Sequence, residues 1–541
     1  MLAPASSREW LRASAIGLAL IVVMTYPLVP AMASAGRVNT GDGRFSIWNV
    51  GWIDHALLTS PSNLFNANIF HPHPGTLAYS ELNLVAGVLG LPAFAVSRNA
   101  LAAHNFAVAL ALLLTFVLTW ALVRRLTGSA GAGLVSATLF TFCPFVQAHT
   151  AHIQLLMAFG FPLVFLALER FHDRPTWGRG VSIGAALATT ALACAYYGIF
   201  AGLAVGAAAL VFARATRQYW LGLMLAIVTA AVMVLPVVVP FTKARAGIGT
   251  AGERSLADTE PYSGDATMYL SSPSHLHGAL LPTGPESVFP GFLAIGLALA
   301  GIGAGLREAP RQRLAVIAYA VVGGLAFWAS LGPRGGLYSI LFEIVPMIAL
   351  LRAPVRLGIV VTFALAVLAG FAVRRVAAGR LWVVPALIAG AVVELAAMPW
   401  PLARPDPVPE AYRMLASAAP GAVVEFPFMY RSSDYHNHTR YMFGSTAHWK
   451  PLVNGYSDLT PTDFDTIAGP INAFPDPASF EILRARGVRY VVWHMDDYNA
   501  EARARLLERL PPYEAYLKRL TDDRNVWLYE IVGWPESRGG E

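Results

Sequence analysis

An aspartate just beyond the first long apolar segment is the residue best suited to acid–base chemistry. Asp42 lies between Gly41 and Gly43 and precedes a tryptophan-bearing stretch at residues 44–55. A carboxylate at a lipid boundary is partly desolvated, which raises its pKa and makes it a better proton acceptor. We therefore expect Asp42 to have a raised pKa and to act as a base. The alternative is that Asp42 caps the helix that begins near Arg44.

Two histidines and a glutamate follow in the same loop. His71 and His73 stand two residues apart in a proline-rich turn. Because no cysteine or third histidine lies nearby to complete a ligand set, we expect no metal there. We interpret His71 as a residue that positions the loop or contacts a polar ligand. Glu81, before an apolar helix, is either a second carboxylate of the site or an ordinary acid at a helix start.

A third set of polar side chains marks the junction of two apolar segments. His149, His152 and Gln154 lie within six residues of one another. Polar groups that face a helix bundle at a membrane boundary are often functional, so we expect His149 and His152 to bind substrate. Solvation of a tight turn is the alternative.

Two arginines, Arg352 and Arg356, stand four residues apart. On a helix they would share a face, although Pro354 limits that arrangement to a helix that begins there. Guanidinium groups suit phosphate oxygens, which makes both residues candidate phosphate ligands. The alternative is that they extend to lipid headgroups.

The composition shows that membrane helices must position these residues. The chain has 541 residues, of which 56% are hydrophobic and 13% charged, whereas soluble globular proteins carry about 25% charged residues. This excludes a soluble multidomain enzyme, a disordered chain and a nucleic-acid binder. The only cysteines, Cys143 and Cys194, lie in apolar segments, so neither a disulfide framework nor a cysteine metal site is indicated.

A membrane-spanning helix needs about 20 mostly apolar residues. On that scale the sequence predicts about eleven spans, near residues 13–35, 101–123, 131–148, 152–169, 181–196, 199–213, 219–241, 289–306, 314–331, 355–373 and 381–399. The two spans on either side of Tyr196 are short enough to be one broken pair. We interpret residues 82–97 as an interfacial or re-entrant helix that does not cross.

The positions of the arginines predict the orientation. Short turns with arginines at 124–125, 170–179, 214–217, 307–313 and 374–380 all lie on one side if residues 82–97 do not cross. Basic turns face the cytoplasm. The N-terminus is then cytoplasmic, and the long segments 36–100, 242–288, 332–353 and the tail from 401 are external. The sequence Ala31-Met32-Ala33 is similar to a signal-peptidase site, but we favour a retained first helix.

The composition of the chain changes after a proline-rich linker that begins at Pro399, because charged residues become frequent and apolar runs shorten. Strands are predicted at residues 421–426, 488–494 and 525–531, and helices at 408–418, 477–486 and 500–510. The predicted fold is thus a polytopic α-helical membrane domain, residues 1–400, followed by an external soluble α/β domain, residues 401–541.

The whole arrangement resembles the GT-C class of membrane glycosyltransferases. The resemblance rests on the early aspartate of the first external loop, its His-Pro-x-Pro turn, the number of spans and the external C-terminal domain. The Leu-Gly-Pro, Leu-Arg-Ala-Pro-x-Arg and Asn-Gly-Tyr-Ser elements, the last at Asn454–Ser457, resemble the YfhO-like branch. Gly43 stands where the protein mannosyltransferases of this class have glutamate.

The resemblance implies transfer of a sugar from a polyprenyl-phosphate donor to a glycan, lipid or protein acceptor. Asp42 matches the catalytic acid of the first loop and would deprotonate the acceptor hydroxyl, with inversion at the sugar. Positive charge should stabilise the departing phosphate. Arg352 and Arg356 are the first candidates, followed by Arg44, Lys243 and Arg245. No cofactor or divalent ion is required, and a bacterial cytoplasmic membrane is the implied location.

Two other functions remain open from the sequence. One is a noncatalytic membrane protein whose external domain binds a partner. The other is a lipid or solute transporter, a class that carries ionisable groups near the bilayer midplane. Few such groups lie inside the predicted spans, and Glu394 is the clearest exception.

Overall fold

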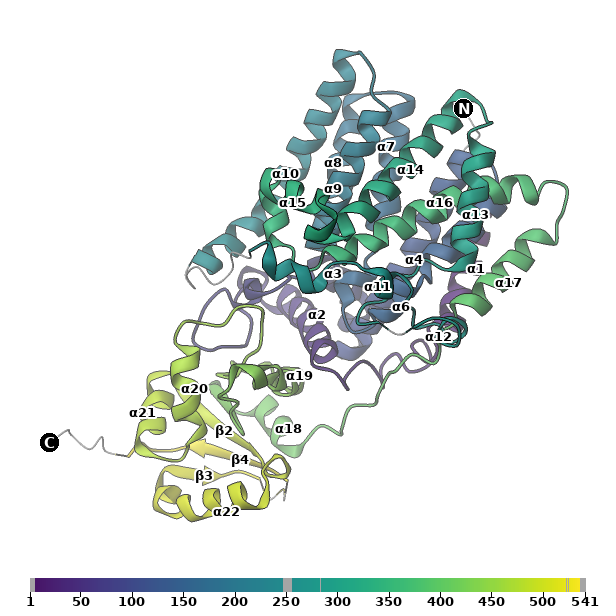
Figure 1. Ribbon diagram of the computed structural model, residues 1–541. Helices are drawn as coiled ribbons and strands as arrows, with labels where there is room; N and C mark the ends of the chain where they lie inside the picture. The colour runs from purple at the N-terminus through teal and green to yellow at the C-terminus, as the bar shows by residue number, and fades with distance from the viewer. Residues whose placement is uncertain (1–4, 247–254, 283, 522, 524, 536–541) are drawn as a thin grey trace.

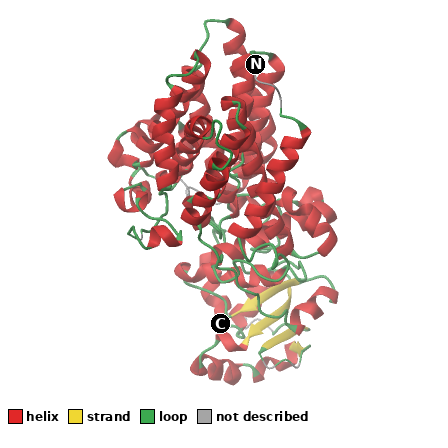
Figure 2. Ribbon diagram, turned by 90° about the vertical axis from the view of Figure 1, so that its right-hand side faces the viewer, coloured by secondary structure: helices red, strands yellow, loops and turns green. Residues whose placement is uncertain are grey.

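Two parts of different architecture make up the molecule. The computed structural model describes residues 5–246, 255–282, 284–521, 523 and 525–535. An elongated bundle of helices carries a small sheet with its own helices at one end (Figure 1), and the chain's N-terminus lies toward the opposite end of the bundle (Figure 2). The predicted helical fold with a small C-terminal sheet is thereby confirmed.

The bundle contains helices of unequal length. In the first half of the bundle they are α1 (Ser7–Met24), α2 (Gly41–Thr59), α3 (Leu84–Ser97), α4 (Ala100–Thr127), α5 (Ala130–Thr141), α6 (Pro144–Ala148), α7 (Gly160–Asp173), α8 (Trp177–Ala193), α9 (Ala195–Val211) and α10 (Arg217–Ala246). Beyond it are the short α11 (Ala266–Tyr269) and α12 (His275–Gly278), then α13 (Phe292–Gly305), α14 (Pro310–Ser330), α15 (Leu337–Ile344), α16 (Gly358–Val376) and α17 (Val383–Leu395).

Six helical segments of the described chain are long and apolar enough to cross a membrane. They are Ala100–Thr127, Ala130–Ala148, Ile153–Asp173, Arg217–Ala244, Pro310–Ser330 and Pro354–Val376. Three shorter apolar helices, α9, α13 and α17, coincide with predicted spans, and α3 coincides with the segment predicted not to cross. The predicted number of about eleven spans therefore stays a prediction.

Helix α16 forms the centre of the bundle, and α10 its edge. The ring of Phe363 on α16 lies 5.2 Å from the rings of both Phe140 and Phe165. Most of the apolar window of α16 is buried inside the protein, whereas only 11% of that of α10 is buried. An apolar helix without protein cover suits a lipid-facing position.

The arginine-bearing turns meet at one end of the bundle. Glu9 of α1 pairs with Arg124 at the end of α4, with 2.9 Å between Oε2 and a guanidinium nitrogen. Asp173, at the end of α7, pairs with Arg125 and with Arg311 at the start of α14. These contacts place the ends of α4 and α7 beside the starts of α1 and α14. This arrangement agrees with the prediction that the arginine-bearing turns lie on the same side of the membrane.

The opposite end carries the C-terminal domain. Its strands are β1 (Ala422–Phe426), β2 (Val488–His494), β3 (Leu517–Arg519) and β4 (Val526–Ile531), and its helices are α18 (Glu410–Ser417), α19 (Thr439–Ser445), α20 (Phe464–Asn472), α21 (Pro477–Ala485) and α22 (Ala500–Arg509). The sheet order is β1-β2-β4-β3, with β1 and β2 parallel and the other pairs antiparallel. The three strands and three helices predicted from the sequence are confirmed.

The sheet has a hydrophobic core on each face. Alternate residues of β2 point to opposite sides, so Tyr490 and Val492 pack with α18 while Val491 and Trp493 join the other core. That second core includes Trp48 of α2 and other residues of the loop segment 36–100. The loop and the C-terminal domain therefore share one hydrophobic core.

Backbone hydrogen bonds join the loop to the domain as well. Leu452 lies beside β1 and donates its N–H to Asn68 O at 2.9 Å, and His71 N donates to Leu452 O at 2.7 Å. A Cβ on Gly455 would lie 2.6 Å from the ring of Phe70, so only glycine permits this close approach. The segment around Leu452 thus pairs with the edge of β1, and the loop pairs with the other side of that segment.

Asn68 makes the polar contacts at the centre of this junction. It is buried, its Oδ1 accepts from Trp48 Nε1 at 3.0 Å, and its Nδ2 donates to Ser445 Oγ at 3.0 Å and to Lys450 O at 3.2 Å. A buried polar group left without its partner destabilises a fold.

We predict that Asn68→Ala lowers the free energy of unfolding by about 2 kcal/mol, since buried partners lose their hydrogen bonds. Tryptophan fluorescence of the full chain during thermal unfolding in detergent measures the effect. Asn63→Ala is the control, because the side chain of Asn63 is exposed and donates to the nearby Ser60 Oγ. An equal effect of both substitutions would contradict the role given to Asn68.

Candidate functional site

Asp42 occupies the first turn of α2 but does not cap it. Thr40 is the cap, and its Oγ1 accepts from Gly43 N at 3.1 Å. The carboxylate of Asp42 is therefore not used as the helix cap, and 57% of its side chain is exposed within the protein. The capping alternative for Asp42 is wrong, because threonine two residues earlier fills that position.

A contact one turn later orients Asp42 toward the histidine turn between α6 and α7. Ser46 lies four residues after Asp42, hence on the same face of α2. Its Oγ donates to Ala151 O at 2.9 Å. As a result, His152 Nε2 lies 3.4 Å from Asp42 Oδ2.

The electrostatics of Asp42 differ from the sequence-based expectation. The hydrogen bond from His152 lowers the pKa of Asp42, and this effect outweighs the upward shift that burial alone would cause. The predicted raised pKa is thus wrong. The carboxylate is ionised at neutral pH and can accept a proton without first losing one.

The second aspartate of α2 shows the opposite behaviour. Asp54 is fully buried, and neither of its carboxylate oxygens has a hydrogen-bond partner among the described residues. Burial raises the pKa of Asp54 to about 8. Of the two aspartates of this helix, only Asp42 is an available carboxylate at neutral pH.

His149 and Glu286 form a second pair beside the first. The ring of His149 lies 5.9 Å from that of His152, and its Nε2 lies 3.1 Å from Glu286 Oε2. His149 Nδ1 faces Phe145 O at 2.7 Å, so both ring nitrogens face oxygen acceptors. Only a doubly protonated ring can donate to both. The pair is therefore built to hold a proton between ring and carboxylate.

The pKa values of His149 and Glu286 are shifted by burial and by the contact between the two residues. Burial lowers the pKa of His149, and the hydrogen bond to Glu286 opposes that shift. Burial, the largest single effect, disfavours the ionised form of Glu286, but the hydrogen bond from His149 and the charges of His149, Arg356 and His152 together outweigh it and leave the pKa of Glu286 lowered.

Arg356 supplies the positive charge of the site. It lies in the 3-10 turn Pro354–Leu357 that leads into α16, with its guanidinium carbon 5.0 Å from the centre of the Tyr196 ring. Its buried Nε has no hydrogen-bond partner within the described chain. Its charge acts on Asp42 and on Glu286. We refer to Asp42, His149, His152, Glu286 and Arg356 as the polar cluster.

Arg352 contacts two tyrosines, and one of them, Tyr196, also contacts Arg356 of the polar cluster. Its backbone N–H donates to Tyr196 Oη at 3.0 Å, and its exposed guanidinium donates to Tyr262 Oη and lies 4.1 Å from the centre of that ring. The two arginines do not share an α-helical face, because α16 begins only at Gly358. They converge on Tyr196 instead.

Glu81 lies near the polar cluster in a different role. Its Oε1 accepts from Ala195 N at 2.7 Å, so it caps α9 rather than the helix that follows it in sequence. Burial raises the pKa of Glu81. A carboxylate at a helix N-terminus is favourable.

Three of the predicted substrate-binding residues, Arg44, His71 and Lys243, make no contact with the polar cluster among the described residues. Arg44 donates to Thr439 Oγ1 at 3.2 Å and to Val38 O at 2.8 Å, toward the C-terminal domain. His71 Nε2 contacts Arg486 O at 3.0 Å, also in that domain. Lys243 is exposed near the end of α10, and the side chain of Arg245 lies outside the described part of the chain.

The sequence interpretation missed three residues around Asp42. The sequence interpretation assigns Glu286 no role, although it lies three residues before the predicted span 289–306. Tyr196 was noted only as a break between spans. Tyr456 of the Asn-Gly-Tyr-Ser element packs against Phe45, with 6.2 Å between ring centres. Burial, together with the charge of Asp42, raises the pKa of Tyr456.

The other member of that element has a structural role. Asn454 is buried, its Oδ1 accepts from Glu425 N at 2.8 Å, and its Nδ2 donates to Glu425 O at 2.9 Å.

Among the described residues, no group of three histidine, cysteine or carboxylate side chains is arranged to hold a metal ion.

Comparison with known proteins extends this description. No protein-family model and no curated protein matches the chain. Two cryo-EM structures of a mutant mycobacterial arabinofuranosyltransferase, AftD, match 98% of this chain with TM-scores of 0.60 and 0.58, at 17% and 16% identity. The apo oligosaccharyltransferase of Archaeoglobus fulgidus matches 95% of this chain and 72% of its own, with a TM-score of 0.49 and 13% identity.

The likeness to AftD concerns the fold. The chain spans 42% of the length of that arabinofuranosyltransferase. The likeness supports the expected fold of several apolar helices with a small C-terminal sheet, and the apolar helices make the protein a multi-pass membrane protein. Membership of the GT-C class stays a prediction. The YfhO-like branch stays a prediction.

We predict that Glu286→Gln lowers the pKa of His149, since the carboxylate no longer opposes the effect of burial. NMR titration of isotope-labelled histidine rings in the full chain measures this shift. Glu501→Gln, on the distant α22, is the matched control and should leave His149 unchanged. A His149 pKa that stays constant or rises in Glu286→Gln would show that the two groups do not share a proton.

Proposed function

We propose that the protein is a membrane glycosyltransferase that transfers a sugar from a polyprenyl-phosphate donor to a hydroxyl group at the external face of the membrane. The fold likeness to an arabinofuranosyltransferase supports sugar transfer. The observation that carries the proposal is the ionised, partly exposed Asp42, hydrogen-bonded by His152 and close enough to Arg356 to be affected by its charge.

The transfer step uses one base and one leaving group. Asp42 accepts the proton of the acceptor hydroxyl, and the hydroxyl oxygen bonds to the anomeric carbon of the sugar. The bond from that carbon to the phosphate oxygen breaks, and the phosphate leaves with the electron pair from the opposite face. The configuration at the anomeric carbon is inverted, and proton transfer to a positioned carboxylate lowers the barrier.

Arginines stabilise the charge that develops on the leaving phosphate. Arg356 has a buried Nε without a partner among the described residues, so it can donate there without first breaking a bond. Arg352 adds an exposed guanidinium next to Tyr196 and Tyr262. Donors that are already in place contribute most to catalysis of this kind. With this positive charge present, the proposed step requires no metal ion.

Apolar surface beside Arg352 suits a lipid tail. Ile340 and Ile344 of α15, and Met347 and Leu350 of the turn that follows, are at least half exposed. They directly precede Arg352 in the chain. A donor whose phosphate contacts arginine can therefore lay its hydrocarbon chain along this surface, within the membrane boundary.

The transporter alternative has less support. Glu394 was its clearest feature, but its carboxylate accepts from Leu293 N at 3.1 Å and from His277 Nε2 at 3.0 Å. It thereby caps α13 at the external end of the bundle. A helix-capping carboxylate explains this residue without a transport path.

We expect Asp42→Asn to lower transfer by about 10²–10⁴-fold, the contribution of a general base. Transfer from a lipid-linked sugar donor in proteoliposomes measures the rate. Asp434→Asn makes the same chemical change elsewhere in the external part, where the carboxylate accepts only from Ser433 Oγ. If Asp42→Asn transfers sugar as fast as this control, Asp42 is not the base.

A second prediction concerns pH. The low-pH limb of the rate profile follows ionisation of Asp42, and the hydrogen bond from His152 lowers the pKa of that group. His152→Ala removes the bond, so the pKa of Asp42 rises and the limb moves to higher pH. The rate therefore falls more at pH 5 than at pH 8.

Rate profiles of the two proteins in the same assay measure this shift. His275→Ala is the control, because His275 is exposed and contacts Met398 O. An unchanged limb, or one displaced to lower pH, would contradict the pairing of Asp42 with His152.

A further inference from the structure

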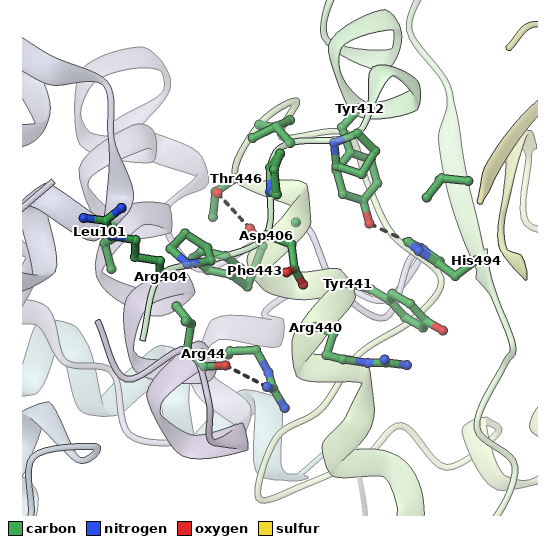
Figure 3. Close-up of a pocket in the computed structure, with 18 of the residues that line it drawn as sticks. Arg44, Leu101, Arg404, Asp406, Tyr412, Arg440, Tyr441, Phe443, Thr446 and His494 are labelled. Carbon is green, nitrogen blue, oxygen red and sulfur yellow. Dashed lines mark hydrogen bonds between the residues drawn. The ribbon is translucent and has the colours of Figure 1, made fainter. Parts of the chain in front are cut away.

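A hollow lies at the junction between the bundle and the C-terminal domain. It has a volume of about 1090 Å³, and we call it the junction cleft. Arg44 of α2 and Asn99 before α4 form one wall, the linker residue Asp406 another, and Arg440 and Tyr441 of α19 a third. Figure 3 shows Arg44, Asp406, Arg440 and His494 arranged around the same space.

The junction cleft is separate from the polar cluster, although α2 borders both. Arg44 contacts Thr439 and faces the cleft, whereas Asp42 contacts His152. Two residues apart on a helix point to nearly opposite sides. No residue of the polar cluster lines the junction cleft.

The lining of the cleft offers both donors and acceptors without a dominant charge. Among the described residues that line it, five are arginines and five are aspartates or glutamates. Arg440 is paired with Asp497 through two bonds of 2.9 Å, and Arg413 with Glu410 at 2.7 Å. A charged ligand would meet as many like charges as opposite ones.

Other lining groups keep hydrogen-bonding capacity. Arg440 Nε is buried without a partner in the described structure. Arg404 and Asp406 are exposed side chains of the linker, one a donor and the other an acceptor. Deeper in the cleft, Tyr412 donates to Glu425 at 2.6 Å, and His494 Nε2 contacts the same oxygen at 2.7 Å. These hydrogen bonds fix the side chains of Tyr412 and His494 at the inner wall of the cleft.

Sugars match this chemistry. Each hydroxyl group both donates and accepts, so it can bond to an arginine and to a carboxylate at once. The volume of the cleft reaches the upper end of the range of about 300–1,000 Å³ for small-molecule sites. A ligand of several sugar units fits such a volume better than one sugar does.

We infer that the junction cleft binds a neutral oligosaccharide, and that this is a second glycan site apart from the polar cluster. The inference rests on the proposed function in one respect, because it identifies the oligosaccharide as the acceptor glycan that is being extended. The cleft retains that glycan next to α2 while its terminal hydroxyl reacts at Asp42.

The test is binding of the fluorescently labelled full chain, in detergent, to an array of neutral and uronate-containing oligosaccharides. We expect binding to neutral members of about four or more sugars. Arg404→Ala combined with Asp406→Ala should weaken binding by about tenfold or more, because two hydrogen-bonding side chains are lost. Arg505→Ala combined with Glu501→Ala, an exposed pair on α22, is the matched control.

The outcomes separate this inference from the proposed function. Asp42→Asn should bind the array like the wild-type protein even though it transfers sugar far more slowly. Binding that is absent, restricted to uronate-containing glycans, or unaffected by the Arg404 and Asp406 substitutions overturns the inference and leaves the transfer proposal intact. Unimpaired transfer by Asp42→Asn, with binding lost only in the cleft variant, overturns the assignment of the base and leaves the glycan site intact.

Discussion

The shared hydrophobic core of the loop segment 36–100 and the C-terminal domain is the constraint on which the site depends. Asp42 can face His152 only while the first turn of α2 stays at the boundary between the two parts of the molecule. Trp48 enters the core of the domain, Asn68 satisfies its indole, and Leu452 pairs with the loop backbone. On the other face, Ser46 fixes α2 to the turn before His152. The helix is therefore held from both sides.

Within this frame, the surroundings of each carboxylate decide its chemistry. Asp42 and Asp54 lie on one helix, yet a hydrogen bond keeps the first ionised, and burial raises the pKa of the second to about 8. Glu81 and Glu394 are each used at the N-terminus of another helix. Of these four acids, only Asp42 combines ionisation, exposure and a nearby guanidinium nitrogen without a partner among the described residues, and this combination is the reason for proposing it as the base.

The sequence predicts the local features well and the long-range ones poorly. Periodicity located the three main strands and their helices, because alternation and turn residues are local properties. The sequence also identified Asp42, His149, His152 and Arg356 as candidate site residues, since each lies at a boundary of an apolar segment. It could not show that His71 contacts Arg486, that Glu81 caps α9 or that Glu286 pairs with His149. Those contacts join residues more than a hundred positions apart. The predicted direction of the Asp42 pKa shift was wrong for the same reason, because the shift depends on a contact with His152, which is also distant in the sequence.

The most direct test of the account is a structure of the full chain with a phosphonate analogue of a polyprenyl-phosphate sugar, which cannot undergo transfer. The account predicts that the phosphonate contacts the guanidinium of Arg356. It also predicts that Asp42 lies on the opposite face of the sugar ring, with room for a hydroxyl between the carboxylate and the anomeric carbon. An analogue bound away from Arg356, or with Asp42 and the phosphonate on the same face of the ring, would contradict it.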